Sequence, residues 1–201
     1  MTFSDITFRG PSLFDCPLLN RLPHGYAKLL REVNGFIAFD GGFHLRGICD
    51  EPAWHSLNKA LEGEQAIHAL FPAVQASDIP FAQDCIGDQF ILRKGVIHRL
   101  SRESGEIESM DLSWVEFFTA MEADPFEFLE MHPLLQFQRE GGELQPGQLL
   151  SAWPPFVTKE AARGVSLRAI PTAERISFLA DFARQLASIR DGEQVRIRWV
   201  E

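Results

Sequence analysis

The chain has 201 residues, of which 45% are hydrophobic and 23% charged, and its net charge is -9. This composition is typical of a globular protein with one domain and excludes a disordered chain. The N-terminus has no secretory pattern, and no apolar run approaches the roughly 18 residues of a membrane span. Three widely spaced cysteines without a C-x-x-C pair indicate a reducing compartment, so we expect a cytoplasmic protein without membrane contacts; they are Cys16, Cys49 and Cys85.

The first part of the chain alternates between helical and extended patterns. Apolar residues at helical spacing over residues 26–33 predict a helix that ends at Asn34-Gly35. Residues 43–49 follow a glycine turn and predict a strand. A second helical region begins near Asp50 and includes Trp54 on its apolar face.

Residues 79–107 carry the strongest strand signals of the chain. Two runs rich in β-branched and aromatic residues, 89–93 and 96–100, are separated by Lys94-Gly95, which is typical of a hairpin. Gly87-Asp88 marks a turn before the first run, because glycine reaches positive φ easily and aspartate can bond to its own backbone. We therefore predict a β-meander at the centre of the fold.

Two short helices are predicted after the meander. Ser113 and Glu116 form a capping box, in which the serine accepts from the amide three residues on and the glutamate reaches back. Asp124 and Pro125 begin a second helix, with the aspartate as its cap. The residues of the first helix that would face the core are Trp114, Phe117, Phe118 and Met121.

An acidic segment overlaps these helices. Residues 103–138 contain nine acidic residues and no lysine or arginine, which equals the whole excess of 28 acids over 19 bases. Such a field repels nucleic acid and anionic membranes and would steer a basic partner toward it. A solvated helix face is the ordinary explanation, but the absence of compensating bases favours a partner. The predicted partner-binding residues are Glu106, Glu108, Asp111, Glu116, Glu122, Asp124 and Glu127.

The last third of the chain is predicted to be a helix-strand extension packed on the same core. Its first part is rich in turns, at Gly141-Gly142, Pro146-Gly147 and Pro154-Pro155, with apolar residues between them. Apolar spacing over residues 173–189 predicts the longest helix, and alternation over residues 195–199 predicts a final strand. We therefore expect residues 1–201 to form a single domain.

Motifs for cofactor binding are absent from the sequence. The phosphate-binding loops G-x-G-x-x-G and G-x-x-x-x-G-K-[ST] do not occur. None of the six histidines has the spacing of a metal site. We therefore expect no cofactor and no metal.

A few polar and aromatic residues allow two explanations each. Asp84 and Asp88 could form an acid and base pair, but aspartate beside glycine is more often a turn residue. Cys85 and His98 could approach one another, although a buried thiol and a strand histidine are the ordinary explanation. A tryptophan can be a ligand platform or part of the core. If a cleft exists, its candidate residues are Trp54, Asp84, Asp88 and Trp153.

A set of short motifs stands in order between residues 22 and 129. They are Leu22-Pro23, Tyr26-x-x-Leu29-Leu30, Asn34-Gly35, Trp54, Ile79-Pro80-Phe81-Ala82, Asp84, Gly87-Asp88-Gln89-Phe90, Gly95-Val96 and Ser113-x-x-x-Phe117-Phe118. Taken together, this order resembles the SUKH superfamily, which includes fungal cell-wall-assembly regulators and many bacterial immunity proteins. Beyond Gly141 the resemblance is weaker.

The resemblance implies an α+β fold, with a central and mainly antiparallel sheet flanked by helices and no catalytic apparatus. Bacterial members look like immunity proteins that bind a cognate toxin, often a nuclease. We therefore expect a non-enzymatic module that neutralises a basic toxin domain through its acidic segment. The alternatives are a regulatory scaffold or small-ligand-binding protein of the same fold, and an enzyme that uses Asp84 or Asp88.

Overall fold

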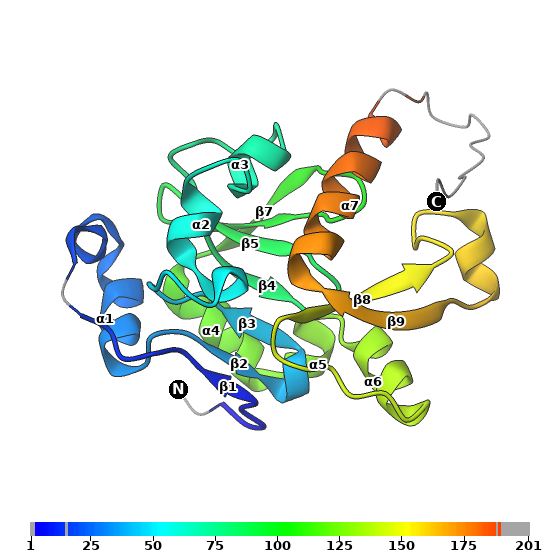
Figure 1. The fold of residues 1–201 in the computed structure, drawn as a ribbon, viewed down its shortest axis with the longest axis horizontal. Coiled ribbons are helices and arrows are strands. Elements are labelled where there is room, and N and C mark those ends of the chain that lie inside the picture. Colours follow the sequence, from blue (N-terminus) through cyan, green and yellow to red (C-terminus); the bar gives the residue numbers. More distant parts are fainter. Residues whose placement is uncertain (1–2, 15, 188, 190–201) are drawn as a thin grey trace.

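Seven antiparallel strands form the central sheet, and their order in the sheet is their order in the chain (Figure 1). The computed structural model describes residues 3–14, 16–187 and 189. Each strand pairs with the next one along the chain, so this sheet has no crossover connection. The strands are β1 (Phe8–Arg9), β2 (Phe36–Ala38), β3 (Phe43–Leu45), β4 (Ile79–Asp84), β5 (Gln89–Arg93), β6 (Val96–Leu100) and β7 (Ile107–Leu112).

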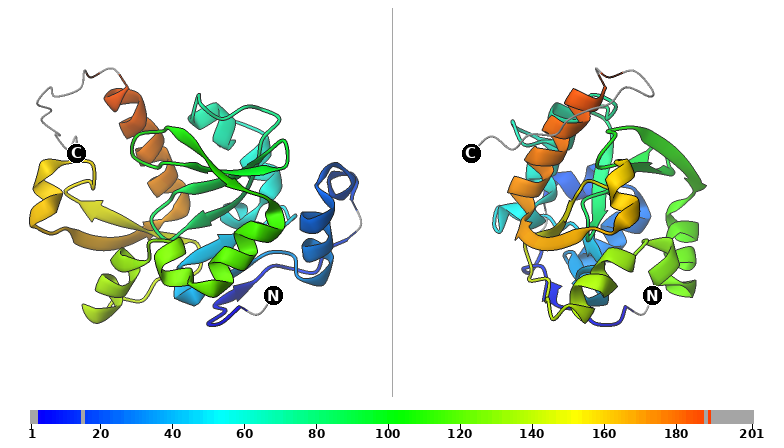
Figure 2. Two further views of the ribbon diagram at one scale, coloured as in Figure 1. Left: turned by 180° about the vertical axis from the view of Figure 1, so that it is seen from behind. Right: turned by 90° about the vertical axis from the view of Figure 1, so that its right-hand side faces the viewer.

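Helices cover both faces of this sheet. In the described part of the chain they are α1 (His24–Glu32), α2 (Leu57–Leu61), α3 (Ile67–Leu70), α4 (Trp114–Ala123), α5 (Pro125–Phe128), α6 (His132–Arg139) and α7 (Thr172–Leu186). The views from the front and the back place α2, α3 and α7 on one face and α4 on the other (Figure 1, Figure 2). A separate two-stranded sheet, β8 (Gln148–Trp153) and β9 (Ser166–Pro171), leads into α7.

The two faces of the central sheet differ in chemistry because successive side chains of a strand point to opposite sides. Phe43 and Phe90 face α4, and their rings lie 6.2 and 5.0 Å from the ring of Phe117. Burial of these aromatic rings is the main stabilising contribution of this layer. On the opposite face, Ile91 packs with Leu179 of α7, so the last long helix closes the second layer of the core.

The structure confirms the α+β fold and the local predictions around the meander. β5 and β6 occupy the two predicted runs, and Lys94 and Gly95 between them have φ angles of 51° and 87°. Two successive positive φ values are what a tight hairpin turn requires. The capping box of Ser113 and Glu116 begins α4, and Asp124 caps α5.

The structure differs from the sequence analysis mainly near Asp50 and after residue 131. The helical region near Asp50 is divided into a 3-10 turn, Ala53–His55, and α2. Neither α6 nor the β8–β9 hairpin is predicted from the sequence. Residues 154–165 separate the paired strands, so no tight-turn signal joins them, and both strands are poor in β-branched residues. The strand predicted at residues 195–199 lies outside the described residues.

The C-terminal extension is joined to the body of the domain. The amide of Leu150 in β8 donates to the carbonyl of Cys85 at 2.8 Å, and this bond links β8 to the turn between β4 and β5. α7 buries its apolar side against the sheet. Among the helices of the described chain, none is both long and apolar enough to cross a membrane.

Gly87 occupies a position where backbone conformation and packing both require glycine. Its φ is 106°, and a Cβ there would lie 2.8 Å from Cδ1 of Leu179, whereas Gly95 has a φ of 87° and nothing within 4 Å. We expect Gly87→Ala to lower the free energy of unfolding by about 2 to 4 kcal/mol, and Gly95→Ala by about 1 kcal/mol. Urea denaturation of both variants measures the difference. Equal losses would show that the approach to Leu179 is unimportant.

Candidate functional site

All seven predicted partner-binding carboxylates belong to exposed residues. β7 is the last strand of the sheet and α4 covers one face, so the elements that carry these residues run from the sheet edge onto that face (Figure 2). We call them the carboxylate set: Glu106, Glu108 and Asp111 beside or in β7, Glu116 and Glu122 in α4, and Asp124 and Glu127 at α5.

The two other acids of the segment have internal partners. Glu103 is buried and accepts hydrogen bonds from the backbone amides of Phe156 and Val157, at 3.0 and 2.7 Å. Glu130 pairs with Arg99, and 2.5 Å separates Oε1 from Nη1. These two acids are not among the seven that the sequence analysis selected.

Three members of the carboxylate set also shape local structure. Glu116 accepts from Oγ and the amide of Ser113, at 2.6 and 2.9 Å, and these bonds hold the pKa of Glu116 below its ordinary value. Asp124 caps α5, and Asp111 accepts from Oγ of Ser109 at 2.7 Å. Charge changes at these positions would disturb the local fold as well as the negative electrostatic field of the carboxylate set. Positions better suited to a test of charge are Glu106, Glu108 and Glu127, whose Oε1 lies 3.9 Å from Nε2 of the exposed His132.

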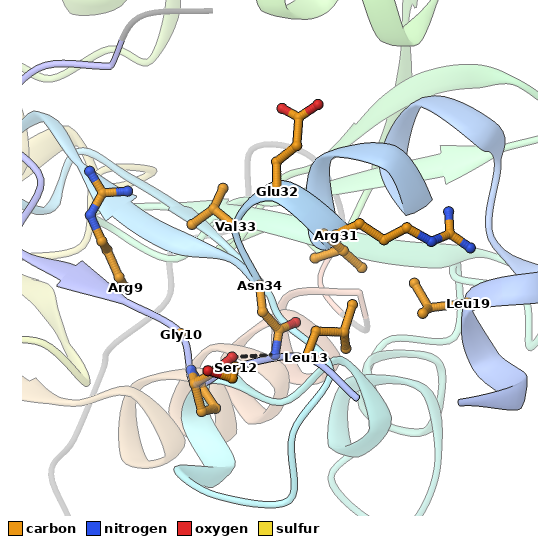
Figure 3. Close-up of a pocket in the computed structure, with 11 residues that line it drawn as sticks. Arg9, Gly10, Ser12, Leu13, Leu19, Arg31, Glu32, Val33 and Asn34 are labelled. Carbon is orange, nitrogen blue, oxygen red and sulfur yellow. Dashed lines mark hydrogen bonds between the residues drawn. The ribbon is translucent and has the colours of Figure 1, made fainter. Parts of the chain in front are cut away.

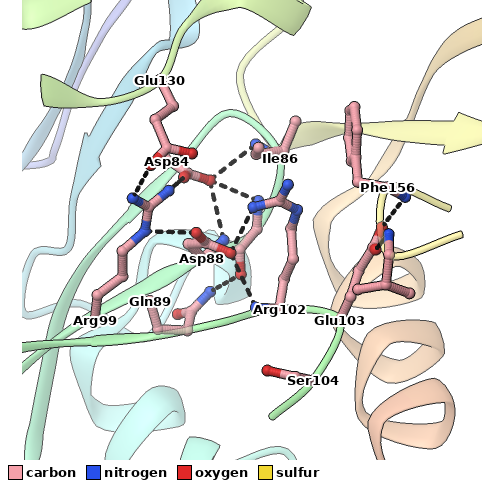
Figure 4. A network of polar contacts seen from close by, with 12 residues as sticks. Asp84, Ile86, Asp88, Gln89, Arg99, Arg102, Glu103, Ser104, Glu130 and Phe156 are labelled. Carbon is pink, nitrogen blue, oxygen red and sulfur yellow. Dashed lines mark hydrogen bonds and ion pairs between the residues drawn. The ribbon is translucent and has the colours of Figure 1, made fainter. Parts of the chain in front are cut away.

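Asp84 and Asp88 form the centre of a buried network of charges (Figure 4). Oδ1 of Asp84 accepts from three successive backbone amides, those of residues 86–88, at 2.8 to 3.0 Å. Asp88 accepts from Nε of Arg99 at 2.6 Å, and from Nη1 and the amide of Arg102 at 2.8 and 2.9 Å. The turn between β4 and β5 is thereby tied to β6 and to the residues that follow it.

Neither aspartate is accessible to a substrate. The exposed fraction is 1% for Asp84 and 2% for Asp88. Burial and the neighbouring charge of Asp88 raise the pKa of Asp84 to about 7, although Arg102 and Arg99 oppose the shift. Because a general acid or base must reach its substrate, this arrangement supports the turn role of the two residues over the acid and base pair.

The sequence analysis missed a buried arginine, Arg175 of α7. It is 1% exposed, and its Nε and Nη2 have no hydrogen-bond partner among the described residues. Nη1 donates to Oγ of Ser151 at 3.4 Å. Burial lowers the pKa of Arg175 to about 10, and the charge of Glu103 opposes this shift. A signal was present in the sequence, because Arg175 stands beside Ile176 on the side of the helix that also carries Leu179.

A directed chain of hydrogen bonds crosses the sheet face opposite α4. Nε2 of His55 donates to the carbonyl of Asn34 at 2.9 Å. Nδ1 of His55 accepts from Nε2 of His44, also at 2.9 Å. Nδ1 of His44 then accepts from Nε2 in the side-chain amide of Gln83 at 3.2 Å. Both imidazoles are neutral in this arrangement, since a further proton would place two donors face to face. Burial lowers the pKa of both histidines, for His55 to about 4.

The structure does not bring the four candidate cleft residues together in one pocket. Trp54 lines a pocket of about 170 Å³, whereas Asp84 and Asp88 are buried in the charge network. Trp153 is 39% exposed and is the last residue of β8. Gly147 directly precedes the first residue of β8, and its backbone lies against the indole of Trp54. The two tryptophans are thus associated with opposite ends of a six-residue strand, which spans about 17 Å. The spacing of residues in the sequence does not show which of them lie close together at the ends of the strands.

A larger groove of about 740 Å³ lies beside α1 (Figure 3). It is lined by residues 9–13, by Leu19 and by residues 30–34. Asn34 joins its two sides by donating from Nδ2 to the carbonyl of Pro11 at 2.9 Å. The guanidinium groups of Arg9 and Arg31 point in different directions, so they do not converge on one anion.

The described residues contain no group of three or more histidines, cysteines and acids placed to hold a metal ion. Cys85 is buried with Leu134 and Leu150. His98 is partly exposed on β6, where its Nδ1 lies 3.2 Å from the carbonyl of Val96. These surroundings correspond to the buried thiol and strand histidine of the ordinary explanation.

Comparisons with known proteins bear on the fold alone. No protein-family model matches the chain, and no curated protein matches it significantly. The crystal structure of Atu4351 from Agrobacterium tumefaciens is similar over 87% of this chain and 85% of that chain, with a TM-score of 0.56 and 13% identity. At this identity the likeness shows a shared fold and no shared activity. The resemblance to the SUKH superfamily remains a prediction.

A buried charge of the network should matter more for stability than an exposed one. We expect Asp88→Asn to lower the free energy of unfolding by about 3 to 5 kcal/mol, because Arg99 and Arg102 would lose a buried counter-ion. Glu130→Gln is the matched control: this residue pairs with the same Arg99, but its side chain is 58% exposed, so the loss should stay below about 1 kcal/mol. Urea denaturation measures both values. Similar losses would contradict the structural role of the network.

The histidine chain predicts a pH dependence of stability. The pKa of His55 is about 4 in the folded protein and 6.5 for the free side chain. The stability that His55 contributes is therefore complete above about pH 6.5 and is lost as the pH falls toward 4, by up to about 3 kcal/mol. Asp84 acts in the opposite direction over a similar interval, because its raised pKa favours the folded state at lower pH.

The variant His55→Gln keeps Asp84. The difference in the free energy of unfolding between the wild type and this variant therefore does not contain the contribution of Asp84. We expect the free energy of unfolding of the wild type to fall relative to that of the variant as the pH decreases from about 6.5 to 4. Chemical denaturation at a series of pH values gives the two curves. Parallel curves would mean that His55 is not held in its neutral form.

Proposed function

We propose that the protein is a non-enzymatic binding module of the SUKH type, which acts as a bacterial immunity protein and neutralises a basic toxin domain. The observation that carries this proposal is the carboxylate set, seven exposed acids in a stretch without lysine or arginine. Opposite charges steer two partners together and select against partners of the same sign. A nuclease toxin fits this requirement, because a protein that grips nucleic acid is basic at its binding surface.

The placement of the other acids supports a binding role over a catalytic one. The aspartates considered for catalysis, Asp84 and Asp88, are buried and engaged with backbone amides and arginines. The carboxylate set, by contrast, is exposed, and residues 103–138, which contain it, hold no lysine or arginine. Its charge is therefore directed to solvent, where a partner can meet it.

The alternative, a regulatory scaffold or small-ligand-binding protein, is favoured by a different feature, the pocket beside Trp54. Residues of α2 and α7 line that pocket. These two helices lie on one face of the sheet, and α4 lies on the other (Figure 1, Figure 2). The two activities do not exclude each other, because they would use different sides of the molecule.

Charge reversal tests the proposed function. The variant with Glu106→Lys, Glu108→Lys and Glu127→Lys should bind the basic toxin domain encoded beside its gene at least about 10-fold more weakly than the wild type. The effect should be larger at low salt, where charges are screened less. Isothermal titration calorimetry at two salt concentrations measures both results.

A matched control separates the position of the charges from the total charge. The variant with Glu62→Lys, Glu64→Lys and Glu160→Lys changes the net charge equally at exposed positions outside the carboxylate set. Its affinity should stay within about 3-fold of the wild type. Equal effects of the two variants would contradict a role for the carboxylate set. Absence of a neighbouring toxin gene would contradict the immunity function itself.

A further inference from the structure

A pocket of about 170 Å³ lies between α2 and the N-terminal end of α7, on the sheet face opposite α4. Its walls are largely apolar. The space exists because small side chains line it, where leucine or phenylalanine would fill it at normal packing density. These small lining residues are Ala53, Ser56, Ala60, Thr172 and Ala173.

Trp54 forms a fixed side of this pocket. Its indole packs against the rings of Phe8 and His44, at centroid distances of 4.8 and 5.3 Å. A Cβ placed on Gly147 would lie 2.7 Å from Nε1 of Trp54, so the backbone at Gly147 also touches the indole. Because the ring is held by these neighbours, a ligand would meet a preformed surface and would not need to order it.

Arg46 brings a buried positive charge to the same pocket. It is 3% exposed, and it donates to two backbone carbonyls and to the side-chain oxygens of Gln83 and Gln89, at 2.6 to 3.3 Å. All these acceptors are neutral. Among the described residues no carboxylate forms an ion pair with Arg46, whereas aspartates pair with four other arginines, namely Arg93, Arg99, Arg102 and Arg184.

The uncompensated charge of Arg46 gives the pocket a preference for an anion. Charges in apolar surroundings are screened far less than in water, so a nearby negative group would be attracted strongly. Burial lowers the pKa of Arg46 to about 10, which is the direction expected for a buried cation that lacks a counter-ion. Lys59, exposed on α2, lines the same pocket and adds a second positive charge.

We propose that this pocket binds a small carboxylate whose body is one apolar ring or a branched chain of similar size. The volume sets the size, because a cavity of about 150 Å³ is known to hold benzene. The indole of Trp54 and the alanines would contact the apolar body, while Arg46 and Lys59 favour the carboxylate. Residues of both α2 and α7 line the pocket, so the ligand would join the C-terminal extension to the body of the domain.

Benzoate and phenylacetate are the probes that test this site, and benzyl alcohol and benzylamine are the neutral and cationic controls. Calorimetric titration of the full chain should give a Kd at or below about 1 mM for an acid, and binding at least about 10-fold weaker for the controls. The acid should also raise the midpoint of thermal unfolding. Equal binding of the acid and the alcohol, or no binding of either acid, would overturn the proposal.

Two variants locate the binding in this pocket. Ala173→Trp fills the space from an exposed position and should weaken binding of the acid by at least about 10-fold, with a circular dichroism spectrum as the check on folding. Lys59→Gln should weaken binding of the acid by about 2- to 5-fold and leave the affinity for benzyl alcohol unchanged. Lys28→Gln, at an exposed position of α1 outside the pocket, should bind as the wild type does. Unchanged affinity in Ala173→Trp would place the binding elsewhere and overturn the proposal. The outcome is independent of toxin binding, which the carboxylate set would mediate.

Discussion

The buried aspartates at the turn between β4 and β5 are the constraint on which the rest of the structure depends. Asp84 holds three successive amides of the turn, and Asp88 binds Arg99 and Arg102. Within the same turn, the carbonyl of Cys85 accepts the amide of Leu150 from β8. One turn therefore positions the central hairpin, the end of β6 and the C-terminal extension. A buried carboxylate without such partners is costly, so these elements cannot shift independently.

The two faces of the central sheet differ in composition, so the two sides of the molecule present different chemistry. The face under α4 is packed with aromatic rings, so the outer surface of α4 is left to charged residues such as Glu122. The face under α2 and α7 carries polar side chains, among them His44, Gln83 and Arg46, which bond to one another. A pocket with a buried charge arises on that face where Arg46 lies beside small side chains, among them Ala60 and Ala173. A partner protein and a small ligand would thus approach from opposite sides.

Features that depend on neighbours in the chain could be predicted from the sequence. The turn at Lys94-Gly95 needs two successive residues at positive φ, and the capping box at Ser113 needs a glutamate three residues on. The exposed acids were predictable because a stretch without basic residues cannot be neutralised by its own helix partners. The α+β class was expected from the resemblance of the ordered motifs to a known superfamily, and the structure confirms it.

The meeting of residues that are far apart in the chain depended on the tertiary structure alone. Glu103 finds its donors in residues 156 and 157, and Arg46 finds its acceptors in β4 and β5. No spacing rule predicts such contacts, because they arise only when the sheet faces and α7 pack together. The sequence by itself determined the strands of the central meander, the caps of α4 and α5 and the acidic stretch. The fold determined that Asp84 and Asp88 are internal supports, that Trp54 and Trp153 belong to separate places, and that Arg46 is buried without a counter-ion.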